Sequence, residues 1–516
     1  MSKKRPKTPW VRRASGSVSA PRNDAPPTPE TAEKAAVVRL PVALALAFLV
    51  ALPVPGLINV LEGASLALVT MLISMPIWYE AARARASPFD TLTSRAIAVV
   101  LACAGFLVFW SLLSTFGATA PARASRYIAT LIAGFAIYFM VRSTVTRSRI
   151  VLYSDLLAAG LAATSALSLL GYEIGFLRDI IFKGTDRAAG FFKNPNQFGM
   201  AISTAVPAVM ALILGVRERR KFRIACLLLM LLGLVASGSK TNFLLAWGTL
   251  LAMLCGHAWI FYDGLRRYLM LALSVLGSVV FAGLGFVVIR MINPRALEIM
   301  LAFFSGGGEV DSLLTRSFLW VYSIDQFLAD PVLGQGAGQR IDIFYRDADV
   351  SHSHNVLLDY MRTLGAPGAI VMAVLIGTVS IICLMSIFKA LRSENGAPDA
   401  RLLCLGLSLS SLSYIAANMS SDSFGPSTSP FFWVFTYLSF ATRSLMLSPR
   451  MDFSKVKSQV ALGAKLDPFP DLLPQDLYGD AGPKAEAASK GRYGVRIALL
   501  AAGLVLTFAA LILMQS

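Results

Sequence analysis

Residues 366–388 read APGAIVMAVLIGTVSIICLMSIF, without a single charged side chain. The hydrocarbon core of a bilayer needs about 20 apolar helical residues per crossing, so this stretch predicts a membrane span. Lipid offers the backbone no hydrogen-bond partners, and the run lacks the alternation of a barrel strand, so the span should be an α-helix. Similar runs predict 13 candidate spans in all: 40–56, 57–78, 96–116, 127–141, 150–170, 196–215, 223–238, 241–262, 268–289, 366–388, 402–418, 429–447 and 496–514.

The composition agrees with an all-α, polytopic transmembrane helix bundle of about 12–13 spans. Of the 516 residues, 56% are hydrophobic and 15% are charged, whereas charged residues make up about a quarter of a typical globular chain. All five cysteines fall in apolar spans. A soluble cytosolic enzyme, a disordered hub and a disulfide-stapled secreted domain are therefore poor interpretations.

The net charge of +17 raises the question of a nucleic-acid partner. If the N-terminus is cytoplasmic, 34 of the 47 Lys and Arg residues fall on the cytoplasmic side of the predicted spans. That bias is the positive-inside rule of membrane proteins. We therefore interpret the charge as a topology signal with some attraction to anionic membrane lipid, and we expect no nucleic-acid partner.

The chain divides into four predicted parts. Residues 1–35 are basic and rich in Pro and Ser, which predicts a disordered cytoplasmic tail. The transmembrane domain should span 36–447, followed by a cytoplasmic linker over 448–494 and an additional helix over 495–516. Within the domain, the outer connection 290–365 is much longer than a turn between helices requires, and long loops are often functional.

This outer loop contains two recognisable features. The stretch Leu313–Ala329 is a predicted amphipathic helix with Leu314, Phe318, Val321 and Leu328 on one face. The glycines 334, 336 and 338 follow it, but no Lys-Ser/Thr pair and no strand–helix frame surrounds them, so a nucleotide-binding loop is not indicated. We expect instead a turn packed against the membrane surface.

The first candidate constellation precedes the span 196–215. Asn194 and Pro195 form a typical helix start, with the free amides of the helix facing outward. Arg187 and Lys193 add two cations beside the positive end of that helix dipole, and Asn196 adds a further polar group. The alternatives are a well-formed helix start only, or a site for a phosphate-bearing ligand at the membrane boundary.

The second constellation is Arg316 and Trp320, which are four residues apart and share one side of the predicted helix. An arginine beside an interfacial tryptophan is routine in membrane proteins. The alternative is that the guanidinium binds a diphosphate in a bidentate way while the aromatic ring supports a sugar or a lipid.

The third constellation is His352 and His354, two of the three histidines in the chain. With Asp347 and Asp349 upstream they could form a metal site, but a second cluster at recognised spacing is lacking. A histidine acting as general base is more economical, because its ordinary pKa lies near the pH of the compartment. We interpret the third histidine, His257, as structural.

Several motifs together resemble the bacterial O-antigen ligase and polysaccharide polymerase superfamily, whose members are inner-membrane glycosyltransferases using undecaprenyl-diphosphate-linked sugars. The resemblance covers about 180–370. It rests on an ordered set of motifs: R-x-x-G-F-F-x-N-P-N (Arg187–Asn196), S-G-S-K (Ser237–Lys240), R-x-x-x-W (Arg316–Trp320), D-P-V-L-G-Q-G (Asp330–Gly336), and His354-Asn355 with Gly365 eleven positions after His354. Lys240 departs from the pattern, since an arginine is expected there, and a lysine lacks the planar fork.

The resemblance implies transfer of a lipid-linked glycan to an acceptor sugar hydroxyl at the periplasmic face of the inner membrane. Read independently, the residue chemistry predicts a metal-independent and cofactor-free transfer, and direct in-line attack predicts inversion at the anomeric carbon. The implied partners are an undecaprenyl-diphosphate-linked oligosaccharide donor and a glycan or glycolipid acceptor. His354 would accept the proton of the attacking hydroxyl, while Arg187 and Arg316 would stabilise the leaving diphosphate. The implied substrate-binding residues are Lys193, Asn194, Asn196, Lys240, Trp320 and His352.

Two other function classes fit a many-helix chain. A transporter or flippase of lipid-linked saccharides should show internal symmetry and ionisable residues deep in the membrane. A non-catalytic assembly protein would tolerate replacement of the outer His and Arg residues. Within the enzyme class, ligation and polymerisation share the donor and the catalytic demand, so the acceptor stays open at this point.

Overall fold

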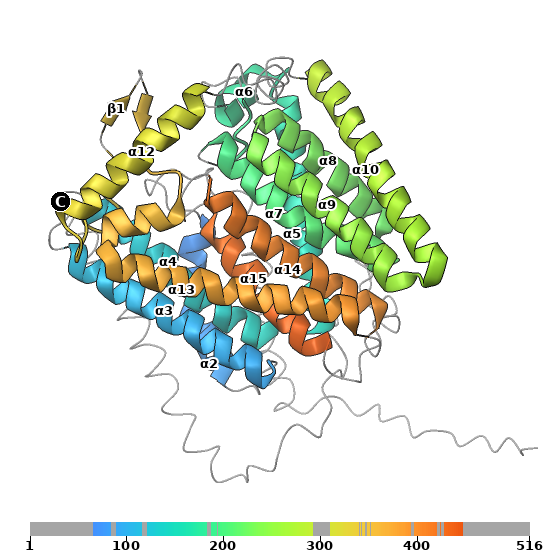
Figure 1. The fold of residues 1–516 in the computed structure, drawn as a ribbon, viewed down its shortest axis with the longest axis horizontal. Helices are drawn as coiled ribbons and strands as arrows, with labels where there is room; N and C mark the ends of the chain where they lie inside the picture. The colour runs from blue at the N-terminus through green and yellow to red at the C-terminus, as the bar shows by residue number, and fades with distance from the viewer. Residues whose placement is uncertain are drawn as a thin grey trace, which may run out of the picture.

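The structure is a computed structural model that describes residues 66–83, 89–115, 121–182, 187–192, 194–292, 310–339, 341, 343–345, 348–350, 352–393, 397–420, 424 and 428–446. Within these residues the chain is helical apart from one small hairpin (Figure 1), which confirms the predicted fold class. The helices are α2 (Leu66–Arg83), α3 (Thr91–Thr115), α4 (Pro121–Thr144), α5 (Arg147–Leu170), α6 (Gly175–Phe182), α7 (Pro195–Gly215), α8 (Arg220–Ser237), α9 (Lys240–Phe261), α10 (Gly264–Ile292), α12 (Val310–Ala329), α13 (Val356–Arg392), α14 (Pro398–Asn418) and α15 (Ser429–Met446).

Among the described residues, seven helices are long and apolar enough to cross a membrane: α3, α4 from Tyr127, α5 from Arg149, α7, α9, α13 and α14. The chain is therefore a polytopic helical membrane protein. Four further predicted spans overlap helices outside this set of seven, namely α2, α8, α10 and α15. The predicted spans 40–56 and 496–514, the tail 1–35 and the linker 448–494 lie outside the described residues, so the total of 12–13 stays a prediction.

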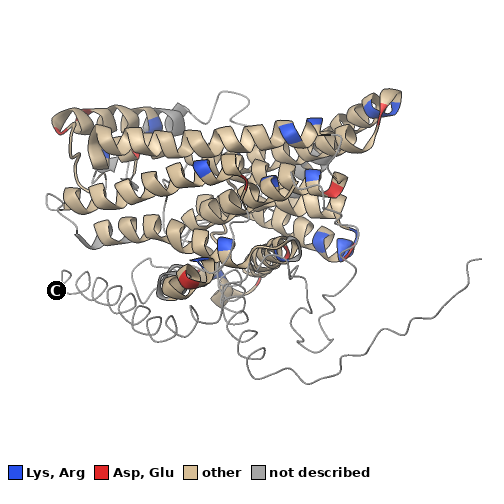
Figure 2. Cartoon of the chain, turned by 90° about the horizontal axis from the view of Figure 1, so that it is seen from below, with Lys and Arg blue, Asp and Glu red and all other residues tan. Residues whose placement is uncertain are grey.

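The long helices run back and forth between two ends of the bundle (Figure 1). The helices α5 and α8 end, and α7, α9 and α13 begin, at one end of the bundle, which we call the site end. The helices α6 and α12 and the hairpin lie on this side. The opposite end is the basic end. Figure 2 shows the described Lys and Arg residues gathered mainly toward the basic end, the right-hand side of that view.

Small residues let the central helices approach closely, as is typical of membrane helices. A Cβ atom added to Gly406 of α14 would lie 2.5 Å from the Cβ atom of Ala211 and 2.7 Å from the carbonyl oxygen of Pro207, both in α7. Gly233 of α8 packs in the same way on Ser165 of α5. These contacts pack α14 on α7 and α8 on α5, and α7 also packs on α8.

The outer elements differ in part from the expectation. The amphipathic helix is present as α12, and it packs on α13. Its predicted apolar face is not the packed one, because Phe318, Val321 and Leu328 are exposed while Leu319 is buried. An exposed apolar face is typical of a helix lying in a membrane interface. The antiparallel hairpin of β1 (Ile343–Tyr345) and β2 (Ala348–Val350) was not predicted.

Candidate functional site

Arg187 joins two helix ends at the site end. Its Nε atom donates to the carbonyl oxygen of Ser237, the last residue of α8, at 2.8 Å, and its Nη2 atom donates to Asn196 Oδ1 at 2.8 Å. The helix α8 stops there because Gly238 has a φ of 58°, in the left-handed region that favours glycine. A Cβ atom on Gly238 would lie 3.2 Å from Arg187 Nε. The S-G-S-K turn is thus shaped around the guanidinium group.

The beginning of α7 has the predicted cap. Asn194 Oδ1 accepts a hydrogen bond from the Gln197 amide at 2.9 Å, and Pro195 occupies the first helical turn. Asn242 of α9 donates through Nδ2 to the Asn196 carbonyl oxygen at 3.1 Å and to Ser239 Oγ at 2.8 Å. Sequence reasoning missed Asn242, which is buried in an apolar span and belongs to no motif quoted above.

Three cations from separate segments meet at this end. Lys240 is the first residue of α9, and both Arg187 and Arg316 act electrostatically on its ammonium group. Burial lowers the pKa of the Arg187 and Arg316 guanidinium groups from their ordinary value. Bringing like charges together away from water is unfavourable unless a counter-charge joins them. The cluster Arg187–Lys240–Arg316, which we call the cation cluster, is therefore suited to a multiply charged anion.

The segment that carries the two outer histidines is hydrogen-bonded to α12, the helix that carries Arg316. Trp320 of α12 donates through Nε1 to the carbonyl oxygen of Ser353 at 3.1 Å, and Ser353 lies between His352 and His354. The two imidazole rings are 4.4 Å apart between centroids. His354 has a φ of 54°, an unusual conformation for a residue other than glycine and one often found at functional sites.

Asn355 fixes the histidine segment to α13. Its Oδ1 atom accepts hydrogen bonds from the amides of Leu357 at 3.0 Å and Leu358 at 3.2 Å. Ser353 Oγ donates to the Asn355 carbonyl oxygen at 2.9 Å. The His354 backbone is thus held between a capped helix start and the tryptophan contact to α12.

The remaining residues named from the sequence lie apart from these contacts or outside the described residues. Lys193 and Asp347 lie outside the described residues, and Asp349 belongs to β2. Across the part of the chain that the structure describes, no group of three or more His, Cys, Asp or Glu side chains could hold a metal ion. His257 lies in α9 with its ring 4.7 Å from that of Phe261 between centroids.

The Gly-rich segment after α12 fills a break in α13. We call residues Asp330–Gly336 the strap. The helix breaks at Gly365, whose φ is 67°, and Pro367 has no N–H to offer the Thr363 carbonyl. The strap compensates: the Gln335 amide donates to the Arg362 carbonyl at 2.9 Å, and the Gly336 amide donates to that of Thr363 at 3.1 Å.

Two more hydrogen bonds complete this joint. The Ala366 amide donates to the Pro331 carbonyl oxygen at 2.8 Å. Trp110 of α3 donates through Nε1 to the Leu364 carbonyl oxygen at 2.9 Å. The expected turn thus packs on α13, and its contact with the membrane surface stays a prediction. The sequence feature that could have predicted this contact is the pair Gly365 and Pro367, because a helix broken there leaves backbone carbonyl groups without a donor.

Comparison with known proteins bears on the same region. No curated protein matches the chain. Residues 225–373 match the family described as O-antigen ligase. The matched range contains Lys240, Arg316, His352 and His354, and Arg187 precedes it. The chain is therefore similar to O-antigen ligases over residues 225–373, which confirms its resemblance to the O-antigen ligase and polysaccharide polymerase superfamily.

Proposed function

We propose that the protein is an integral inner-membrane glycosyltransferase that transfers or polymerises an undecaprenyl-diphosphate-linked glycan onto a sugar hydroxyl at the periplasmic face. The observation that carries the proposal is the cation cluster, because Arg187 and Arg316 both act electrostatically on Lys240. Trp320, one turn after Arg316, donates to the backbone between the two histidines. A diphosphate is the anion that such a donor would bring there.

The proposed reaction is a direct displacement without a metal ion. The acceptor hydroxyl attacks the anomeric carbon, the new glycosidic bond forms, and the bond to the diphosphate oxygen breaks with its electron pair leaving on undecaprenyl diphosphate. His354 accepts the hydroxyl proton, and the cation cluster stabilises the charge that develops on the leaving group. Attack in line with the departing bond inverts the anomeric configuration.

The remaining predicted residues have supporting roles in this proposal. Asn196 holds the Arg187 guanidinium through its Oδ1 atom, and Asn194 caps the helix whose free amides face the donor. Trp320 supports the sugar or the prenyl chain and holds the His352 and His354 segment. Lys193 would add one further cation.

The test is transfer by the full-length protein in membranes, with purified undecaprenyl-diphosphate-linked glycan as donor. We expect His354→Ala to lower the transfer rate by a factor of about 10² to 10⁴, as for other general bases. Arg316→Gln should lower it by about 10² to 10³, as loss of one charge-stabilising donor does. Arg178→Gln, which removes an exposed arginine of α6 at the same end, is the matched control.

If His354→Ala and Arg316→Gln both keep the full transfer rate at normal protein level, the proposed enzymatic function is refuted and a non-catalytic assembly role is favoured. A requirement for an ion or proton gradient would favour a transporter instead. The product distinguishes the two enzymatic alternatives, since a polymerase lengthens the lipid-linked glycan and a ligase moves it to a different acceptor.

A further inference from the structure

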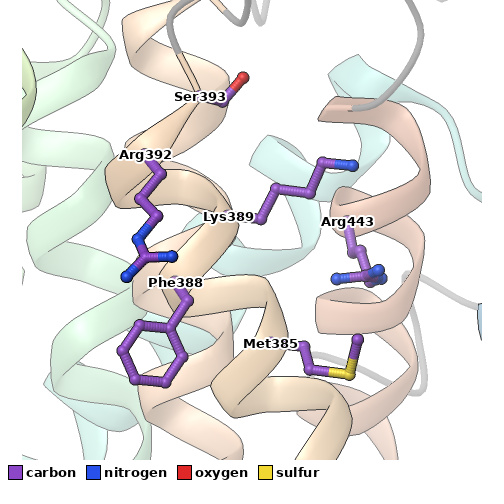
Figure 3. Close-up of a pocket in the computed structure, with 6 residues that line it drawn as sticks. All are labelled: Met385, Phe388, Lys389, Arg392, Ser393 and Arg443. Carbon is purple, nitrogen blue, oxygen red and sulfur yellow. The ribbon is translucent and has the colours of Figure 1, made fainter.

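A second group of cations lies at the basic end, between the last turns of α13 and α15. An open cavity of about 730 Å³ is lined there by Met385, Phe388, Lys389, Arg392, Ser393 and Arg443 (Figure 3). The cavity is separate from the candidate active site, because the histidine segment precedes the first residue of α13 while Lys389 and Arg392 belong to its last turn.

Arg443 is the unusual member of this pocket. The residue is only 5% exposed, and its Nε and Nη1 atoms have no hydrogen-bond partner among the described residues. Asp90 is the nearest carboxylate, with Oδ2 at 3.8 Å from Nε, beyond hydrogen-bond distance. A buried guanidinium with unsatisfied N–H groups is costly, and Asp90 balances the charge without accepting a hydrogen bond from them. An anionic acceptor within hydrogen-bond distance of Nε or Nη1 would therefore be stabilised here.

Lys389 and Arg392 have no acidic partner in the part of the chain that the structure describes. Neither forms an ion pair within the described residues. The carbonyl groups at the end of α13 are bound by a different residue, Arg401, which donates to Ala390 at 2.6 Å and to Leu391 at 3.0 Å. Figure 3 shows the Lys389 side chain extending from α13 toward Arg443 on α15. Lys389 and Arg443 thus face one gap, whereas the Arg392 side chain lies on the other side of α13, beside Phe388.

The rest of the pocket is apolar and continues along the membrane helix. Phe388 is 58% exposed, and Met385 is also exposed on the same helix. Leu384 and Ile381, further toward the middle of α13, are exposed as well. A cation group that ends an exposed apolar helix surface matches a molecule with a charged head and a hydrocarbon tail.

We propose that this pocket binds the phosphate of an anionic phospholipid between Lys389 and Arg443 in the leaflet at the basic end, with Arg392 as a further cation of its lining and an acyl chain along the exposed apolar surface of α13. A lipid fits better than free phosphate, because free phosphate makes no use of the apolar part. The positive-inside bias assigns this end to the cytoplasmic leaflet, which is where anionic headgroups attract basic residues.

Native mass spectrometry of the detergent-purified full-length protein tests this site. We expect phosphatidylglycerol to bind in preference to phosphatidylcholine. The double variant Lys389→Gln, Arg392→Gln should weaken phosphatidylglycerol binding by about ten-fold or more, since each basic residue near a membrane surface contributes about 1 kcal/mol. Neither side chain forms an ion pair among the residues that the structure describes, so the variant should fold; Arg443→Gln is the more drastic second variant.

The matched control is Lys221→Gln, Arg266→Gln, which removes two exposed charges from the same end but outside the pocket. Equal loss of lipid binding in this control would overturn the proposal, because it would show a general surface effect. Equal binding of phosphatidylcholine would also overturn it. Displacement of the lipid by millimolar inorganic phosphate would indicate a plain anion site and would likewise exclude the lipid.

Discussion

At the scale of single residues, the contacts of Arg187 favour an arginine over a lysine at this position. Its Nε atom donates to the Ser237 carbonyl and its Nη2 atom donates to Asn196, so the orientation of the guanidinium group is fixed. A lysine has one ammonium group on a flexible stem and cannot make both contacts in the same geometry. By the same reasoning either a lysine or an arginine should serve at position 240, since Lys240 acts as a point charge at the first turn of α9.

Arg187→Lys should therefore lower glycan transfer by a factor of about 10², close to the loss of one charge-stabilising donor. The measurement is the initial rate of transfer with the lipid-linked donor at equal protein level. Lys240→Arg is the matched change in the opposite direction, and it should keep the rate within a few-fold of the original. An unchanged transfer rate in Arg187→Lys together with a large loss in Lys240→Arg would contradict this division of roles.

Sequence reasoning found the charged members of the site more readily than their supports. Arg187, Arg316 and the histidines stand out because charges and imidazoles are scarce beside apolar runs. Asn242 gave no such signal, because one asparagine within a span looks like any tolerated polar residue. Its importance comes from the tertiary approach of α9 to the start of α7, which no local pattern contains.

At the scale of elements, the joint between the strap and α13 positions the histidine segment. The strap supplies amides to the Arg362 and Thr363 carbonyls, which the broken helix leaves without donors. A buried carbonyl without a partner costs about 1 to 3 kcal/mol. The direction of the first two turns of α13, which follow His354, therefore depends on the strap.

Gly365→Ala should loosen this joint. The new methyl group would collide with the Val332 carbonyl, and alanine disfavours the positive φ of 67° at this position. We expect a lower melting temperature in detergent and reduced transfer. Gly377→Ala in the same helix is the matched control, since an added Cβ there would meet nothing within 4 Å. Equal behaviour of the two variants would mean that the strap does not support the site.

Elements were predicted unequally well, for physical reasons. Long apolar runs specify membrane helices by themselves, so α3, α7 and α13 were identified directly. The amphipathic pattern of α12 located the helix but not its packed side, because an apolar face in a membrane protein serves lipid as well as the core. The three-residue strands of the hairpin are too short to carry a periodic signal.

At the scale of the whole molecule, orientation is the main open prediction. With the basic end in the cytoplasm, the cation cluster and the histidine segment face the periplasm. Asp325→Cys on α12 should then react with a membrane-impermeant maleimide on intact spheroplasts, whereas Lys221→Cys should react only after permeabilisation. Both positions are exposed. The unsubstituted protein reports the background of the five native cysteines, and reversed labelling would reject the periplasmic site.

The dependence of α13 on the strap also bears on how such chains are recombined. The two halves of the joint lie about thirty positions apart, on opposite sides of the histidine segment, yet each completes the hydrogen bonding of the other. A chimera that combined the loop of one protein with the following helix of another would not form the hydrogen bonds between the strap and α13 in the same way. Grafting experiments aimed at acceptor choice should therefore move residues 330–367 as one cassette.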